Sequence, residues 1–138
     1  MHTFEEWQYP IARATILIAD DFAEWRVRVR KILCGRPECQ IIGEACDGVK
    51  AVQKALGLRP HLVILDIGMP LMNGLQAAVK IRKAVPSTKI LFLTQDNDPD
   101  LTSAALSTGA EGYVLKMNAA SELVSAISTA IRNGCPAN

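Results

Sequence analysis

The sequence predicts an α/β domain in which five strands alternate with five helices and form one parallel, doubly wound sheet of (βα)5 type. Short, continuous apolar runs recur along the chain, and a segment with apolar residues at helical spacing follows each run. Connecting helices bury the strands of a parallel sheet on both faces, which is why such strands are continuously apolar rather than alternating. The 138 residues are enough for one domain with a substantial hydrophobic core.

The first two strand–helix units have simple boundaries. Residues 14–19 (ATILIA) form an apolar run, and residues 22–34 have apolar side chains at helical spacing until a Gly-Arg-Pro step ends the helix. Residues 40–45 (QIIGEA) are less apolar, so we expect this strand near an edge of the sheet. Asp47 is a suitable N-cap for a helix over residues 48–58. The apolar face of that helix is expected to contain Val52, Ala55 and Leu56.

The third and fourth units are bounded by capping residues. Residues 62–65 (LVIL) form the third strand, and Asn73 can cap a helix over residues 74–85, which a proline ends. Residues 89–93 (KILFL) form the fourth strand. An Asp-Pro pair, a helical pattern and a following glycine then predict the fourth helix over residues 99–108.

The fifth unit completes the sheet. Residues 112–115 (GYVL) form a short strand, and the last helix is expected to start at Ser121 and to be capped at Gly134. Its inward face is expected to consist of Leu123, Ile127, Ala130 and Ile131. The most apolar runs start at Ile16, Leu62 and Ile90. We therefore place those three strands at the centre of the sheet.

Composition excludes several classes of protein. The chain is 49% hydrophobic and 21% charged with a formal net charge of +1, so we expect a globular domain without the basic surface typical of nucleic-acid binding. No apolar run approaches the ~18 residues of a membrane span, and the N-terminus lacks a signal-peptide pattern, so we expect a cytoplasmic protein that contacts no membrane. A zinc site is not expected, because metal-ligand spacing is missing among Cys34, Cys39, Cys46, Cys135, His2 and His61.

Polar residues follow four of the five predicted strands. Asp20 and Asp21 come directly after the first strand, Asp66 after the third, Thr94 after the fourth and Lys116 after the fifth. The carboxyl ends of parallel strands meet at one edge of a sheet, and ligands bind in the crevice beyond that edge. The sequence therefore predicts that these five side chains gather at one site.

The chemistry of this set favours a divalent cation and a phosphoryl group. Two carboxylates at ~5 Å repel by roughly 3 kcal/mol at an effective dielectric of ~20, and a cation removes that cost. Oxygen ligands alone favour the hard ion Mg²⁺, with Mn²⁺ as an alternative. A lysine and a hydroxyl beside them suit phosphate oxygens, and an aspartate can form an aspartyl-phosphate.

With these motifs in order, the chain resembles the receiver domain of bacterial two-component response regulators. The resemblance rests on Asp20-Asp21, on LDIGMPLMNG around Asp66, on Thr94 and on YVLK ending at Lys116. It covers residues 14–134, which leaves residues 1–13 as an N-terminal extension and 135–138 as a C-terminal tail. It implies a flavodoxin-like, CheY-like sheet with strand order 2-1-3-4-5.

The resemblance also implies roles for the residues of the acidic edge. Asp66 is the expected phospho-acceptor, which takes its phosphoryl group from a phosphohistidine of a histidine kinase or phosphotransfer protein. Asp21 is expected to ligate Mg²⁺ directly, Asp20 through water, and Gly68 through its backbone carbonyl. Gly68 is also expected to influence access to Asp66. The domain is expected to catalyse its own phosphorylation and slow dephosphorylation rather than to act as an enzyme on other molecules.

Three further residues are implied to read the phosphoryl group, and two depart from the usual pattern. Thr94 is the expected switch hydroxyl, Tyr113 the switch aromatic that turns inward, and Lys116 the phosphate-pairing lysine. A small residue usually follows the switch threonine in this family, whereas this chain has Gln95 and then Asp96. We expect Gln95 to cover the acyl phosphate partly and Asp96 to discourage hydroxide, which would lengthen the lifetime of the phosphorylated state.

The output stays open at this point. The stretch EGYVLKMNAASELVSAI resembles receivers that carry a helix-turn-helix DNA-binding domain, so transcription regulation and a homodimer through the fourth helix, fifth strand and fifth helix are expected. The alternative is a stand-alone or phosphorylation-independent receiver that acts as an interaction module. A haloacid-dehalogenase-type phosphatase would need a D-x-D motif after the first strand, and a flavin binder would need a phosphate loop there, so both are disfavoured.

Overall fold

The computed structural model describes residues 13–134 and contains one sheet of five parallel strands in the order β2-β1-β3-β4-β5. The strands are β1 (Ala14–Ala19), β2 (Cys39–Ala45), β3 (Leu62–Leu65), β4 (Lys89–Thr94) and β5 (Gly112–Leu115). The predicted strand order, the parallel pairing and the central position of β1, β3 and β4 are confirmed. The edge position of β2 is also confirmed.

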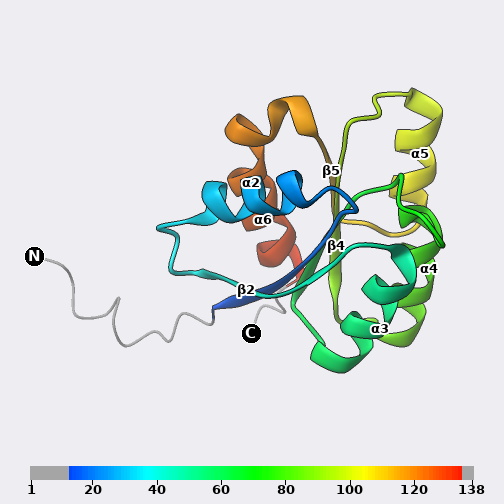
Figure 1. The fold of residues 1–138 in the computed structure, drawn as a ribbon, viewed down its shortest axis with the longest axis horizontal. Coiled ribbons are helices and arrows are strands. Elements are labelled where there is room, and N and C mark those ends of the chain that lie inside the picture. Colours follow the sequence, from blue (N-terminus) through cyan, green and yellow to red (C-terminus); the bar gives the residue numbers. More distant parts are fainter. Residues whose placement is uncertain (1–12, 135–138) are drawn as a thin grey trace, which may run out of the picture.

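Helices cover both faces of the sheet, as its apolar strands predict. They are α2 (Ala23–Leu33), α3 (Gly48–Leu58), α4 (Gly74–Ala84), α5 (Pro99–Ser107) and α6 (Ala119–Gly134), with a short 3₁₀ helix η1 (Lys116–Asn118). Helices α2 and α6 lie on one side of the sheet, and α3, α4 and α5 lie on the other (Figure 1). Each side has its own cluster of buried apolar side chains, in which alternate residues of the same strands point to opposite faces.

Side-chain caps start three of the helices at the predicted residues. Asp47 accepts a hydrogen bond from the backbone N–H of Lys50 at the start of α3, and Asp98 caps α5 in front of a proline. Asn73 and Gln76 form a reciprocal capping box at the start of α4. These caps satisfy backbone donors that a helix leaves free in its first turn.

Some predicted boundaries are wrong by one or two residues, and one element was not predicted. Residues 116–118 form η1, so α6 begins at Ala119 rather than at Ser121. Leu56 was expected on the buried face of α3 but is 44% exposed, and Ala51 takes that position in the core. The N-terminal extension up to residue 12 and the tail 135–138 lie outside the described residues. Among the helices of residues 13–134, none has the length and apolar character that crossing a membrane requires.

The start of α4 packs directly onto the backbone of Asp66. A Cβ atom at Gly74 would lie 2.0 Å from the Asp66 carbonyl oxygen and 2.7 Å from the Ile67 Cα. The Gly74 N–H also donates a 2.7 Å hydrogen bond to the Ile67 carbonyl. Only glycine fits this close approach, so Gly74 fixes the distance between α4 and the end of β3.

We predict that Gly74→Ala lowers the free energy of unfolding by about 1–3 kcal/mol, because the added methyl group collides with backbone that cannot move like a flexible side chain. Gly57→Ala is the matched control, since a Cβ at Gly57 in α3 meets nothing within 4 Å. It is expected to raise stability by about 0.5–1 kcal/mol through helix propensity. Urea denaturation measures both, and equal behaviour of the two variants would contradict the packing described.

Candidate functional site

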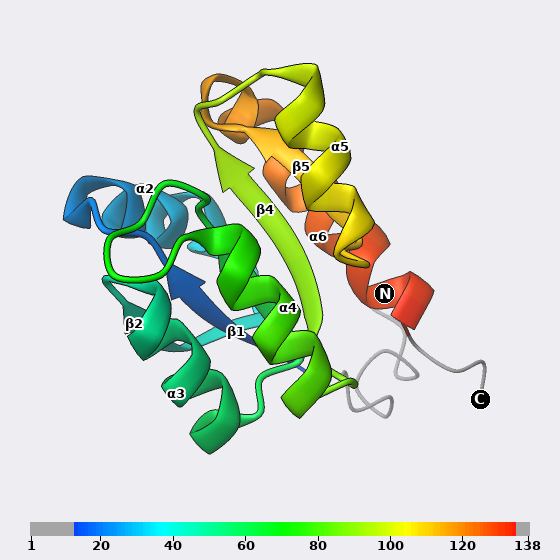
Figure 2. The ribbon, with the colours of Figure 1, turned by 90° about the vertical axis from the view of Figure 1, so that its right-hand side faces the viewer.

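The carboxyl ends of β1 and β3 bring three aspartates together at one edge of the sheet. Asp20 and Asp21 follow β1, and Asp66 follows β3, which pairs with β1 in parallel. One ligand oxygen from each lies within 4.8 Å of the others. Figure 2 shows β1 and β4 pointing toward the same end of the molecule, where this edge lies. The predicted acidic cluster is therefore present.

Lys116 places its ammonium group at this cluster. Its Nζ atom is 2.7 Å from Asp20 Oδ2 and 3.6 Å from Asp66 Oδ2, and the lysine is only 6% exposed. A buried charge destabilises a protein unless it is paired, because it loses its hydration. The attraction between the Lys116 ammonium and the two carboxylates offsets this loss of hydration. The ammonium also reduces the repulsion between the two carboxylates.

The pKa of Asp66 is raised by this environment. Burial raises the pKa of its carboxyl above the ordinary value, the neighbouring Asp20 carboxylate raises it further, and the Lys116 ammonium partly offsets both. Because the pKa is higher in the folded than in the unfolded chain, the stability linked to this group is greatest at low pH. It is lost as the pH rises through the folded-state pKa. One lysine thus leaves the ionised Asp66 incompletely neutralised.

The donor set fits a hard divalent cation. Asp21 Oδ1 is buried and has no hydrogen-bond partner within residues 13–134, although a buried acceptor normally has one. The cluster offers carboxylate oxygens, which are the ligands that Mg²⁺ prefers, and its three members include no sulfur or imidazole ligand. An unpartnered oxygen beside two incompletely neutralised carboxylates is what a metal ion would satisfy.

Thr94 and Tyr113 belong to the neighbouring strands β4 and β5, and Tyr113 is the second residue of β5. Thr94 ends β4 and is 2% exposed. The Tyr113 hydroxyl donates a 2.7 Å hydrogen bond to the Asp96 carbonyl, and its ring centre is 6.3 Å from that of Phe92. Burial raises the pKa of the Tyr113 hydroxyl, and the carboxylates of Asp96, Asp98 and Asp66 raise it further. Tyr113 is therefore attached to the loop that follows Thr94.

The remaining predicted residues lie on the loops that follow β3 and β4. Gln95 and Asp96 are both exposed on the loop after β4. The Asp96 backbone N–H donates to Thr94 Oγ1 over 3.5 Å. Gly68 is exposed and faces open space, since a Cβ built there meets nothing within 4 Å. The proposed effects of these three residues on access and lifetime stay predictions.

Two aromatic residues near the site were not identified from the sequence as site residues. Lys116 Nζ lies 5.0 Å from the centre of the Trp25 ring and 5.8 Å from that of the Phe22 ring. Helical spacing correctly predicts that Trp25 faces inward from α2. The spacing contains no signal that this inward position faces a lysine from the other end of the chain.

Comparisons with known proteins agree with this geometry. A family model described as the response regulator receiver domain matches residues 16–128. The chain is 41% identical over 115 residues to the oxygen regulatory protein NreC of Staphylococcus epidermidis, covering 83% of this chain and 53% of NreC. It is 35% identical over 117 residues to the nitrate/nitrite response regulator protein NarL of Escherichia coli, covering 85% of this chain and 54% of NarL. The chain thus spans about half the length of these curated relatives.

Solved structures show the same likeness. A two-component response regulator of the LuxR family from Aurantimonas superposes with a TM-score of 0.82 at 29% identity, over 87% of this chain and 86% of that one. A DNA-binding response regulator of the LuxR family from Staphylococcus aureus superposes with a TM-score of 0.80 at 28% identity, over 86% of this chain and 98% of that one.

We predict that Mg²⁺ raises the melting temperature of the chain and that Asp21→Asn removes most of this rise. Saturation to 100 times the dissociation constant stabilises a protein by about 2.7 kcal/mol. Glu24→Gln is the matched control, because Glu24 is an exposed carboxylate in the first turn of α2, outside the cluster. Differential scanning calorimetry with and without Mg²⁺ checks this. An undiminished Mg²⁺ response in Asp21→Asn would exclude Asp21 as a ligand.

Proposed function

The chain belongs to the response regulator receiver domain family, and on this premise we propose that it accepts a phosphoryl group on Asp66 from a phosphohistidine of a sensor histidine kinase or a phosphotransfer protein. The observation that supports this most directly is the buried Asp66 carboxylate, 3.6 Å from the Lys116 ammonium and within a cluster of three aspartates. An Asp66 oxygen attacks the phosphorus atom, the phosphorus–nitrogen bond breaks, and the imidazole keeps the electron pair.

The chain's own residues have distinct parts in this proposed transfer. The end of the buried strand β3 holds Asp66 in place, which orients the attacking oxygen. Lys116 supplies positive charge next to that oxygen, where the phosphoryl oxygens arrive. The Thr94 hydroxyl is proposed to bind the phosphoryl group once it is transferred. Mg²⁺, when held by Asp20, Asp21, Asp66 and the Gly68 carbonyl, supplies the positive charge that offsets the phosphoryl oxygens.

We propose that the domain catalyses its own phosphorylation and slow dephosphorylation rather than acting as an enzyme on other molecules. Asp66 keeps the phosphoryl group until water removes it, so one domain accepts one group per cycle. Gln95 and Asp96 are exposed beside Thr94 on the loop after β4. From that place Gln95 is proposed to shield the acyl phosphate and Asp96 to repel hydroxide.

The proposed output is control of transcription. Relatives with similar receiver sequences are described as response regulators, and the LuxR-family protein of Staphylococcus aureus as DNA-binding. Because the chain covers about half of its curated relatives, DNA contact is assigned to a separate domain and not to these residues. The face of α5, β5 and α6 is proposed to change on phosphorylation and to form a homodimer. Tyr113 in β5 connects this face to the Asp96 loop.

We predict that a small phosphodonor such as acetyl phosphate, with Mg²⁺, adds one phosphoryl group to the wild type and none to Asp66→Asn. The amide cannot act as the nucleophile, although it closely matches the carboxyl group in shape. Asp100→Asn is the control, because Asp100 is an exposed carboxylate in the first turn of α5. Intact mass spectrometry measures the gain, and a phosphoryl group retained by Asp66→Asn would refute the assignment. A wild type that takes no phosphoryl group would favour the interaction-module alternative.

We predict that Gln95→Ala shortens the lifetime of the phosphorylated chain by a few-fold, because water gains access to the acyl phosphate. The decay is followed by intact mass after the phosphodonor is removed. Gln53→Ala, which changes an exposed glutamine of α3, serves as the control. An unchanged or slower decay in Gln95→Ala would show that Gln95 does not shield the group.

A further inference from the structure

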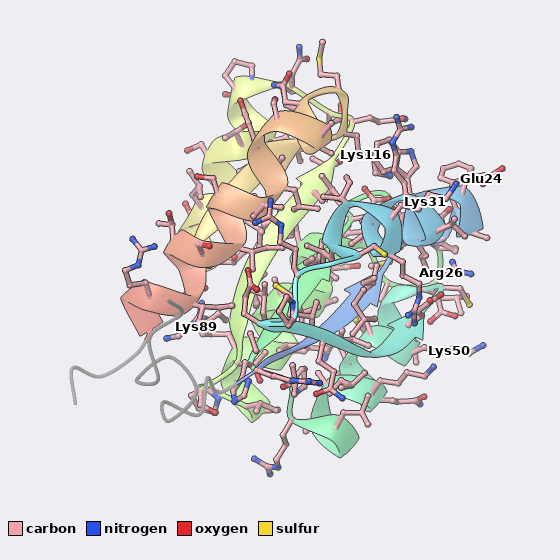
Figure 3. All side chains as sticks on the ribbon, turned by 90° about the vertical axis from the view of Figure 1, so that its left-hand side faces the viewer. Glu24, Arg26, Lys31, Lys50, Lys89 and Lys116 are labelled. Carbon is pink, nitrogen blue, oxygen red and sulfur yellow. The ribbon has the colours of Figure 1, made fainter. Side chains whose placement is uncertain are left out.

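The ammonium group of Lys116 contacts aromatic rings as well as carboxylates. The rings belong to Phe22, the N-cap of α2, and Trp25, in its first turn, at centroid distances of 5.8 and 5.0 Å from Nζ. A cation within ~6 Å of an aromatic face is attracted by the quadrupole of the ring, most strongly by tryptophan. Figure 3 shows Lys116 beside α2, the helix that also carries Arg26 and Lys31. Lys116 thus connects the acidic edge to this helix.

Trp25 is the better anchored of the two rings. It is partly buried and packs against the core cluster on the α2 and α6 side of the sheet, whereas Phe22 is 52% exposed. The Arg28 guanidinium lies 5.2 Å from the centre of the same Trp25 ring. The indole is therefore packed against the core on one side and lies close to the cations of Arg28 and Lys116.

We propose that Trp25 is a positioning residue for phosphoryl transfer, which keeps the Lys116 ammonium at the carboxylates. The inference rests on the proposed phosphorylation of Asp66 and adds a residue to it. An aromatic face attracts the ammonium but has no oxygen atom. A further carboxylate would instead compete with the phosphoryl group for the N–H donors of the lysine. The lysine thus keeps N–H donors available for Asp20, 2.7 Å away, and for the incoming phosphoryl oxygens.

The position of the ammonium explains why such a contact matters. Nζ lies 2.7 Å from Asp20 and 3.6 Å from Asp66, so it is already held beside the carboxylate that would take the phosphoryl group. The lysine side chain is long and has several rotatable bonds, so an unsupported ammonium would lose more entropy on reaching that position. Trp25 restricts this freedom beforehand. It acts through Lys116 and is not itself a catalytic residue.

The first test compares initial rates of phosphorylation by acetyl phosphate with Mg²⁺. Trp25→Leu is expected to lower the rate about five- to tenfold, the loss of one partly buried cation–π contact. Trp25→Phe keeps an aromatic face and is expected to restore most of the rate. Ile32→Val is the control, because Ile32 packs against the same core cluster from α2. Thermal unfolding of each variant confirms that the rates are measured on folded protein.

The second test uses the fluorescence of Trp25 and needs no change at that residue. The sequence has two tryptophans, so Trp7→Phe leaves Trp25 as the single indole. In this background Lys116→Met is expected to shift the Trp25 emission, because the adjacent positive charge is lost. Lys50→Met, which removes an exposed cation of α3, is expected to leave the emission unchanged. Phosphorylation is expected to shift the emission, because the phosphoryl group adds negative charge beside the ammonium that contacts the ring.

The outcomes separate this inference from the proposed function. If the wild type is phosphorylated on Asp66 and Trp25→Leu reacts at the same rate, Trp25 has no positioning role while the proposed function stands. Equal rates for Trp25→Leu and Trp25→Phe, both slower than wild type, would show a packing defect and overturn the inference. If Trp25→Leu does not fold, the fluorescence test decides. A Trp25 emission that is unchanged both by Lys116→Met and by phosphorylation would overturn the inference. A wild type that takes no phosphoryl group overturns both proposals.

Discussion

The pairing of Lys116 with buried carboxylates is the interaction on which the acidic edge of the sheet depends. Its ammonium lies 2.7 Å from an oxygen of Asp20 and 3.6 Å from one of Asp66. Three aspartates in such proximity repel one another, and burial makes each charge more costly. One lysine offsets part of this repulsion and leaves an excess of negative charge. That excess, together with the unpartnered Asp21 Oδ1, is the physical basis on which a site for a cation and a phosphoryl group is proposed.

The parallel sheet is what makes this arrangement possible. Every strand runs in the same direction, so residues that follow β1, β3, β4 and β5 reach the same edge from distant parts of the sequence. The apolar strands are held between two layers of helices, which gives the charged residues a rigid base. The contact of Gly74 with the Asp66 carbonyl then connects Asp66 to α4. The apolar packing of the sheet thus offsets the unfavourable repulsion among the aspartates at its edge.

Much of the fold and the membership of the site could be predicted from local patterns. Continuous apolar runs identified the strands, and Asp47, Asn73 and Asp98 marked helix starts because their side chains bond to nearby backbone donors. Other features have no local signal. Leu71 has a left-handed backbone with φ of 69° although it is not glycine, and residues 116–118 form a 3₁₀ turn. Both turns are closed by backbone hydrogen bonds, from the Met72 N–H to the Pro70 carbonyl and from the Ala119 N–H to the Lys116 carbonyl.

The sequence by itself determined the parallel α/β architecture and the five polar residues at the strand ends, because hydrophobic periodicity and strand direction are encoded within short segments. Only the tertiary structure decided how those residues are paired. It placed Lys116 closer to Asp20 than to Asp66, left an oxygen of Asp21 without a partner, and set the Trp25 ring against the lysine. Such contacts join side chains from separate strands and helices, and their distances follow from how the layers pack rather than from any spacing along the chain.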